Sequence, residues 1–158
     1  MALLKVAEID AWLSRHLGAD REWLDLDRRR ARPPEARSIE SLTPGRLLSI
    51  VRSEIEWLIP RRGIDALIAI CEYGAWPCNE CPHLMGLIRG DSCSHPEIDV
   101  WPGQSFTPSQ REEVVSALWL SLCFGWSIDL YTPTRVIRTD HDGWVWRIER
   151  HDGHDPRR

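Results

Sequence analysis

The stretch CNECPHLMGLIRGDSCSH, residues 78–95, gathers the side chains of this chain that are best suited to binding a metal. It contains three of the five cysteines and two of the six histidines. Two residues separate Cys78 from Cys81, a spacing that lets two thiolates share one tetrahedral zinc ion. Such a structural site predicts about one zinc ion per purified chain. The candidate ligands are Cys78, Cys81 and Cys93, with either His83 or His95 as the fourth.

The same stretch also has an interpretation without metal. The second pair, Cys93 and His95, is spaced Cys-x-His, whereas zinc ribbons and fingers use longer spacings. Without metal, Cys78 and Cys81 would pack as small apolar side chains at the start of a helix. A catalytic zinc would need an open coordination position and a general base, for which Glu80 is the local candidate. A redox role for the CxxC pair is disfavoured because no strand leads into it.

A second group of titratable residues, Asp140, His141 and Asp142, comes directly before Gly143. A histidine flanked by carboxylates can serve as a base or a metal ligand. Aspartate and glycine are also the residues that a tight hairpin turn requires, and alternating apolar segments flank this group on both sides. The sequence therefore favours a turn here.

Other catalytic signatures are missing from the sequence. The chain contains no glycine-rich phosphate loop, no nucleophile elbow and no His-Glu-x-x-His motif. The sequence therefore leaves an enzymatic activity uncertain and favours a protein that acts by binding.

Tryptophan is unusually frequent, with nine in 158 residues. Most of them should pack in or around the core, because an indole ring buries a large area at low conformational cost. Some lie at the ends of predicted elements, where Trp, like Arg, is a common anchor of protein interfaces. The candidate partner-binding residues are Trp76, Trp101, Trp144, Asp140 and Asp142.

Length and charge restrict the class of protein. A chain of 158 residues is about the size of one domain. Its formal net charge of −4 argues against bulk nucleic-acid binding, which needs an excess of Lys and Arg on one face. No apolar run is long enough to cross a membrane, and no signal peptide is recognisable. We therefore expect a cytoplasmic protein, whose five cysteines stay reduced and form no disulfide framework.

The hydrophobic pattern predicts helices first and strands afterwards. Helical spacing covers residues 3–17, 44–59, 64–74 and 108–124, with Thr43 and Thr107 as N-caps followed by prolines. Alternation then predicts strands at residues 126–131, 134–139 and 144–149. The expected fold class is α+β: a single domain with a helical layer followed by a C-terminal three-stranded antiparallel meander. The helix at residues 108–124 should be its buried centre.

Composition suggests four segments along the chain. Residues 1–27 form an N-terminal helical segment, and residues 28–37, RRRARPPEAR, form an Arg/Pro-rich linker or a basic contact for an acidic partner. Residues 38–150 are the α+β body. Residues 151–158 are expected to be a flexible tail, because they lack an apolar anchor.

Three short motifs in the body resemble a group of small bacterial α+β proteins. They are EYGAWP at residues 72–77, FGW at 124–126 and HDGW at 141–144. Proteins of this kind occur among the immunity proteins of polymorphic toxin systems. The resemblance implies a protein that binds a toxin partner and occludes it without catalytic residues of its own. The alternative is a small zinc-binding protein in which the Cys/His cluster holds an interaction loop or a metal-dependent active site.

Overall fold

The protein has a mixed α+β fold in the computed structural model, which describes residues 2–18, 33–59, 63, 65–72 and 102–150. The described strands form one seven-stranded sheet in the order β1-β4-β3-β5-β6-β7-β2, and all neighbouring strands are antiparallel. The elements in chain order are β1 (Ala2–Leu4), α1 (Val6–Leu17), β2 (Arg37–Ser38), α2 (Pro44–Leu58), β3 (Ala66–Glu72), β4 (Gly103–Phe106), α4 (Arg111–Cys123), β5 (Ser127–Tyr131), β6 (Arg135–Asp140) and β7 (Trp144–Glu149).

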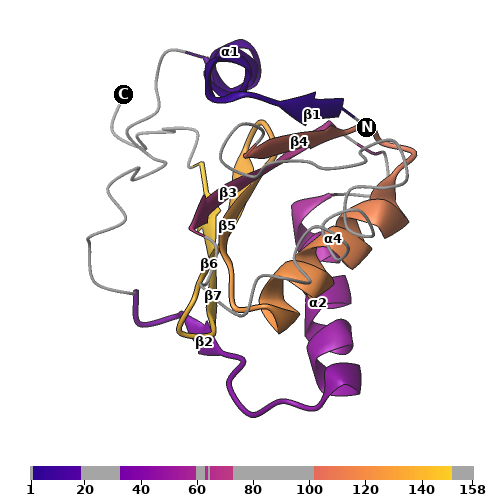
Figure 1. Ribbon diagram of the computed structural model, residues 1–158, viewed down its shortest axis with the longest axis vertical. Helices are drawn as coiled ribbons and strands as arrows, with labels where there is room; N and C mark the ends of the chain where they lie inside the picture. The colour runs from indigo at the N-terminus through magenta and orange to yellow at the C-terminus, as the bar shows by residue number, and fades with distance from the viewer. Residues whose placement is uncertain (1, 19–32, 60–62, 64, 73–101, 151–158) are drawn as a thin grey trace, which may run out of the picture.

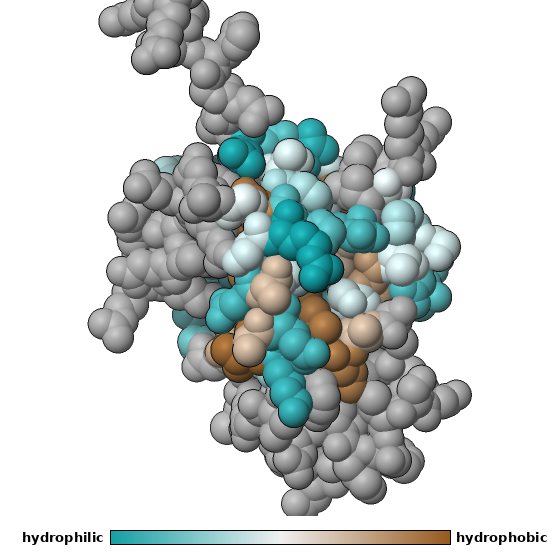
Figure 2. Space-filling model, turned by 90° about the horizontal axis from the view of Figure 1, so that it is seen from above, coloured by the Kyte–Doolittle hydropathy of each residue, from teal (hydrophilic) through white to brown (hydrophobic). Residues whose placement is uncertain are grey.

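Helices cover both faces of the sheet. Helices α2 and α4 lie side by side against one face, and α1 lies at the other, next to β1 (Figure 1). The larger core is between the sheet and the α2–α4 pair, and the smaller core is beneath α1. Seen from above, the described surface at this end of the molecule is largely hydrophilic, with hydrophobic residues visible between the polar ones (Figure 2). Among the described residues, no helix is both long and apolar enough to cross a bilayer.

The helix predicted at residues 44–59 is confirmed, and it spans Pro44–Leu58. The hydroxyl of Thr43 accepts a hydrogen bond from the backbone N–H of Arg46 at 3.4 Å, as expected of an N-cap. Pro44 occupies the first turn, where its missing N–H costs nothing. Val51, Ile55 and Leu58 are fully buried on one face, so the helical spacing in the sequence predicts the face that packs.

Helix α4 is shorter than predicted, because it begins at Arg111 and not at Pro108. Residues 107–110 form a turn in which the Gln110 N–H donates to the carbonyl of Thr107 at 3.0 Å. The Gln110 side chain accepts from the Thr107 N–H, also at 3.0 Å, which is the contact that the capping-box spacing predicts. Pro108 has the same preferred backbone angle in this turn as in a first helical turn, so the sequence does not distinguish the two.

The helix predicted at residues 64–74 is wrong, because Ala66–Glu72 form strand β3. This strand lies between β4 and β5, and its consecutive residues Leu67 and Ile68 are buried in the two different cores. A strand that is apolar on both faces, as β3 mostly is, shows no alternation and appears in the sequence as a short apolar run. Such a run also contains apolar residues at helical spacing, so periodicity cannot separate the two structures.

The predicted C-terminal meander is part of a larger sheet. Strands β5, β6 and β7 are antiparallel neighbours, as expected, but β3 continues the sheet beyond β5 and β2 continues it beyond β7. Strands from the first half of the chain therefore belong to the same sheet, and the helices do not form a layer that precedes it in sequence. Within the segment predicted to be a linker, Arg37 pairs with Val145 as part of β2.

Helix α1 packs on the sheet of the predicted body. Its residues Trp12, Leu13 and Leu17 are buried in the smaller core with residues of β3, β5 and β6. Gly103 on β4 allows the helix to come close, because a Cβ atom there would lie 2.5 Å from the side chain of Ile9. The side chain missing at Gly103 therefore makes room for α1.

A charged pair is buried on the sheet face that α1 partly covers. Asp129 and Arg138 are directly opposite each other on β5 and β6, and they are 2% and 4% exposed. Arg138 donates to both carboxylate oxygens of Asp129, at 2.9 and 3.2 Å. Tyr131 donates its hydroxyl to Asp129 at 2.7 Å. Burial lowers the pKa of Arg138, but the charge and hydrogen bonds of Asp129 raise that pKa above its ordinary value, so the arginine stays charged.

Tyr131 should make the protein less stable in alkali. Burial and the neighbouring Asp129 carboxylate raise the pKa of Tyr131 well above its ordinary value. Above pH of about 10 an unfolded tyrosine loses its proton, whereas the folded protein keeps it, so stability falls as the pH rises. Urea unfolding midpoints of wild type and Tyr131→Phe, measured from about pH 8 to about pH 11, test this. The midpoint of Tyr131→Phe should fall less steeply; equal slopes would contradict the prediction.

Candidate functional site

The sequence Asp-His-Asp-Gly forms the tight turn of the β6–β7 hairpin, as predicted. Asp140 and Trp144 are the last paired residues of the two strands, and residues 141–143 form the loop. Gly143 has a φ of 76°, in the left-handed region that glycine adopts without strain. The carboxylate of Asp140 accepts a hydrogen bond from the Trp144 N–H at 3.1 Å. Asp140 therefore stabilises the turn and holds Trp144 in place.

The segment between β2 and α2 is bound to this hairpin through its backbone. The Ile39 N–H donates to the carbonyl of Gly143 at 2.8 Å. A Cβ atom at Gly143 would be in ordinary contact with Ile39 and with the backbone of Glu40, at 3.6 Å or more. The hydrogen bond therefore brings Glu40 into the lining of the same pocket as Asp142, although the two residues are far apart in the sequence.

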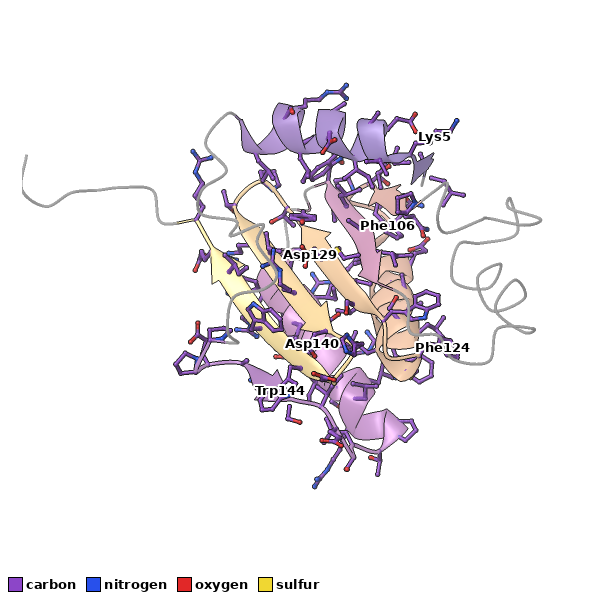
Figure 3. All side chains as sticks on the ribbon, turned by 60° about the vertical axis from the view of Figure 1, so that its left-hand side comes forward. Lys5, Phe106, Phe124, Asp129, Asp140 and Trp144 are labelled. Atoms are coloured by element: carbon purple, nitrogen blue, oxygen red, sulfur yellow. The ribbon has the colours of Figure 1, made fainter. Side chains whose placement is uncertain are left out.

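The hairpin, the β2–α2 segment and the end of α4 surround a pocket of about 690 Å³, which we call the hairpin pocket. This volume is in the range of pockets that bind drug-sized ligands. In Figure 3, Asp140 and Trp144 lie at the end of the sheet that is remote from Lys5 and α1, with Phe124 at the end of α4 to one side. The apolar lining includes Ile39, Leu42, Leu47 and Leu122, and the polar and aromatic lining includes Glu40, Cys123, His141, Asp142 and Trp144.

His141 is held at the pocket by contacts with Ser127 and Asp142. Its backbone N–H donates to the hydroxyl of Ser127 at 3.0 Å, and its Nδ1 atom is 3.5 Å from the same oxygen. Its Nε2 atom is 3.5 Å from a carboxylate oxygen of Asp142. The set of Ser, His and Asp matches a catalytic triad in composition, but Ser127 is only 1% exposed and already accepts the backbone N–H of His141. These contacts hold the hairpin against β5. Because Ser127 is buried, a substrate cannot reach its hydroxyl.

Cys123 is the remaining reactive side chain of the hairpin pocket. It is exposed at the end of α4. The surrounding side chains nevertheless remove enough water from the thiol to raise its pKa above the ordinary value. A thiol with a raised pKa is a poor nucleophile at neutral pH, because the thiolate is the reactive form. The chemistry of Cys123 therefore does not suggest catalysis.

The partner-binding candidates on the hairpin come together, and the others lie outside the described residues. Asp140, Asp142 and Trp144 belong to one hairpin, and the last two line the pocket. The side chain of Asp142 is 57% exposed, whereas that of Asp140 supports the turn. The candidates outside the described residues are Trp76 and Trp101.

The zinc candidates also lie outside the described residues, so the zinc site stays a prediction. They are Cys78, Cys81, His83, Cys93 and His95. Within the part of the chain that the structure describes, no group of three or more His, Cys, Asp or Glu side chains is arranged to hold a metal ion.

The sequence did not predict two polar residues of the site, Glu40 and Cys123. Glu40 belongs to no motif, and it is brought to the hairpin by the pairing of Ser38 with Trp144 and by the backbone hydrogen bond between Ile39 and Gly143. Cys123 is in a helix that is apolar nearly all round, so its type and spacing resemble those of the core. The capping signal at Thr43 marks the nearby start of α2 but gives no information about what that helix end faces.

Comparisons with known proteins give no relative for this chain. No protein-family model, no curated protein and no solved structure matches it.

Proposed function

We propose that this protein is a cytoplasmic, protein-binding inhibitor of the bacterial immunity type, which neutralises a partner toxin by occluding it. The observation that carries the proposal is that Asp142 and Trp144 both line the hairpin pocket. An indole next to an apolar pocket is a common anchor of protein interfaces, and exposed carboxylates steer a basic partner towards it.

The rigidity of the hairpin supports the same function. The turn is fixed by the Asp140 carboxylate, by the left-handed Gly143 and by the backbone hydrogen bond from Ile39. A loop that is already ordered loses little conformational entropy when a partner binds, so more of the contact energy contributes to affinity. The formal net charge of −4 adds long-range attraction to a basic toxin or nuclease surface.

The test uses the protein encoded by a neighbouring toxin gene. Cells that express this toxin should grow only when the full chain is co-expressed, and the two purified proteins should form a complex by calorimetry. Asp142→Lys puts a positive charge at the exposed tip of the turn and should weaken binding by at least about tenfold. Trp144→Ala should weaken it similarly by removing an anchor.

The matched control is Asp10→Lys, which makes the same charge reversal on the exposed face of α1, at the other end of the molecule. Asp10→Lys should bind within about twofold of wild type. The proposal would be overturned if wild type gave neither protection nor a complex. Equal binding by Asp142→Lys and wild type would remove the hairpin from the interface.

A further inference from the structure

The described acidic and basic residues that line the hairpin pocket carry charge of one sign, since Glu40 and Asp142 are among them. Glu40 and Asp142 are lining residues that carry a carboxylate, and both are exposed. Among the described residues that line the pocket, none is a lysine or an arginine. His141 contacts Asp142 through Nε2 at 3.5 Å.

Much of the remaining lining is apolar. Leu47 and Leu122 are buried at the start of α2 and the end of α4, and the half-buried indole of Trp144 stands at the hairpin. A group that fills the pocket must therefore combine an apolar stem with a positively charged end. The side chains that meet this description are arginine and lysine, which bury their methylene stems while the charged head stays at the rim.

This protein already holds two of its own arginines, Arg135 on β6 and Arg147 on β7, against Trp57 of α2 and a carboxylate. The guanidinium carbon of Arg147 lies 4.9 Å from the centre of the Trp57 ring, and the group donates to both oxygens of Glu54 at 2.7 and 3.2 Å. The guanidinium carbon of Arg135 lies 5.1 Å from a ring centre of the same Trp57 side chain, and the group donates to Glu149 at 2.7 Å. An indole together with a carboxylate thus binds two guanidinium groups within this fold.

We infer that the hairpin pocket receives an arginine side chain of the protein partner, with Glu40 and Asp142 as its carboxylate acceptors and Trp144 as its aromatic contact. The inference rests on the proposed function and names the chemistry of the partner's anchor. Arginine suits the pocket better than lysine, because its planar guanidinium bonds two carboxylates at once and stacks on an indole. The volume of about 690 Å³ also accommodates the residues that flank the arginine.

Short peptides test the inference without the partner. The isotopically labelled full chain is titrated with acetyl-Gly-Arg-Gly-amide and with acetyl-Gly-citrulline-Gly-amide, which has nearly the same shape but no charge. The arginine peptide should shift the amide signals of Gly143 and Trp144 with a Kd of about 1 mM. Raising the salt from about 0.05 to about 0.5 M should weaken it several-fold, because the carboxylates are exposed. The citrulline peptide should bind at least about fivefold more weakly.

Conservative variants locate the binding. The double variant Glu40→Gln with Asp142→Asn keeps the shape of both side chains and should bind the arginine peptide no better than wild type binds the citrulline peptide. Glu113→Gln, an exposed residue in the first turn of α4, is the matched control and should leave binding unchanged.

Alkylation of Cys123 gives a second measure of occupancy. Iodoacetamide labelling, read at each cysteine by peptide mass spectrometry, should slow at Cys123 when the arginine peptide is present. Labelling at Cys71, an exposed cysteine on β3 that does not line the pocket, should not change and serves as the internal reference.

The outcomes separate this inference from the proposed function. Equal shifts by both peptides, or no shift at the hairpin with about 10 mM arginine peptide, would overturn the arginine pocket. If Asp142→Lys still abolished toxin binding in that case, the hairpin would remain the interface with another anchor. If the arginine peptide bound as expected but no toxin were neutralised, the pocket would stand and the immunity function would fall.

Discussion

Replacing Asp129 with alanine should lower the free energy of unfolding by about 3–5 kcal/mol. Asp129 and Arg138 are almost completely buried and form two hydrogen bonds with each other. Loss of the carboxylate leaves a buried guanidinium without this counter-charge and leaves the hydroxyl of Tyr131 without its acceptor. The penalty comes mainly from the uncompensated charge and not from the net strength of the pair.

Urea unfolding followed by circular dichroism measures this change, and two further variants define its cause. Asp129→Leu combined with Arg138→Met removes both charges and should recover most of the lost stability. Arg52→Ala breaks an exposed ion pair with Glu112, across α2 and α4, and should leave the unfolding midpoint almost unchanged. If Asp129→Ala unfolded at the same urea concentration as Arg52→Ala, the buried pair would not contribute as described.

The second large effect is expected in α4. Leu118→Ala should lower the free energy of unfolding by about 2–5 kcal/mol, because Leu118 is fully buried in the larger core and truncation leaves a cavity there. Ser116→Ala, on the exposed face of the same helix, produces the same final residue without a cavity and should cause little change.

The same unfolding experiment distinguishes the two α4 variants. A loss at Leu118 close to that at Ser116 would mean that α4 is not the centre of the core. The position of α4 matters for function because Leu122 and Cys123, at its end, line the hairpin pocket. Leu118→Ala should therefore also weaken binding of the arginine peptide, whereas Ser116→Ala should leave that binding unchanged.

Local signals in the sequence predicted the elements that depend on neighbouring residues. Thr43 and Pro44 mark the start of α2, because a cap is made by residues within one turn of each other. The turn at Asp140–Gly143 was predictable for the same reason, since Gly143 supplies the left-handed backbone and Asp140 the side-chain acceptor. The alternation in β5, β6 and β7 predicted three adjoining strands, which are present as antiparallel neighbours.

The failure at β3 has a physical cause. Leu67 and Ile68 are buried in different cores, because α1 covers one face of the sheet and α2 and α4 cover the other. Alternation arises when one face of a strand is polar, as in β5, where Ser127 and Asp129 alternate with Ile128 and Leu130 although all four are buried. Strand β3 is mostly apolar on both faces and shows no such pattern. Since the covering helices come from distant segments, residues 64–74 alone do not indicate that both faces are buried.

By itself the sequence determined the acidic hairpin and its turn, because the residues that form them are adjacent in the chain. Only the tertiary structure decided that this hairpin borders a pocket. Glu40 arrives through the Ile39–Gly143 hydrogen bond, and Leu47 and Leu122 arrive through the packing of α2 beside α4. Propensity and periodicity describe interactions between residues that are close in the sequence. A pocket is formed by segments that are far apart in the sequence, and neither segment alone carries a pattern that reveals the other.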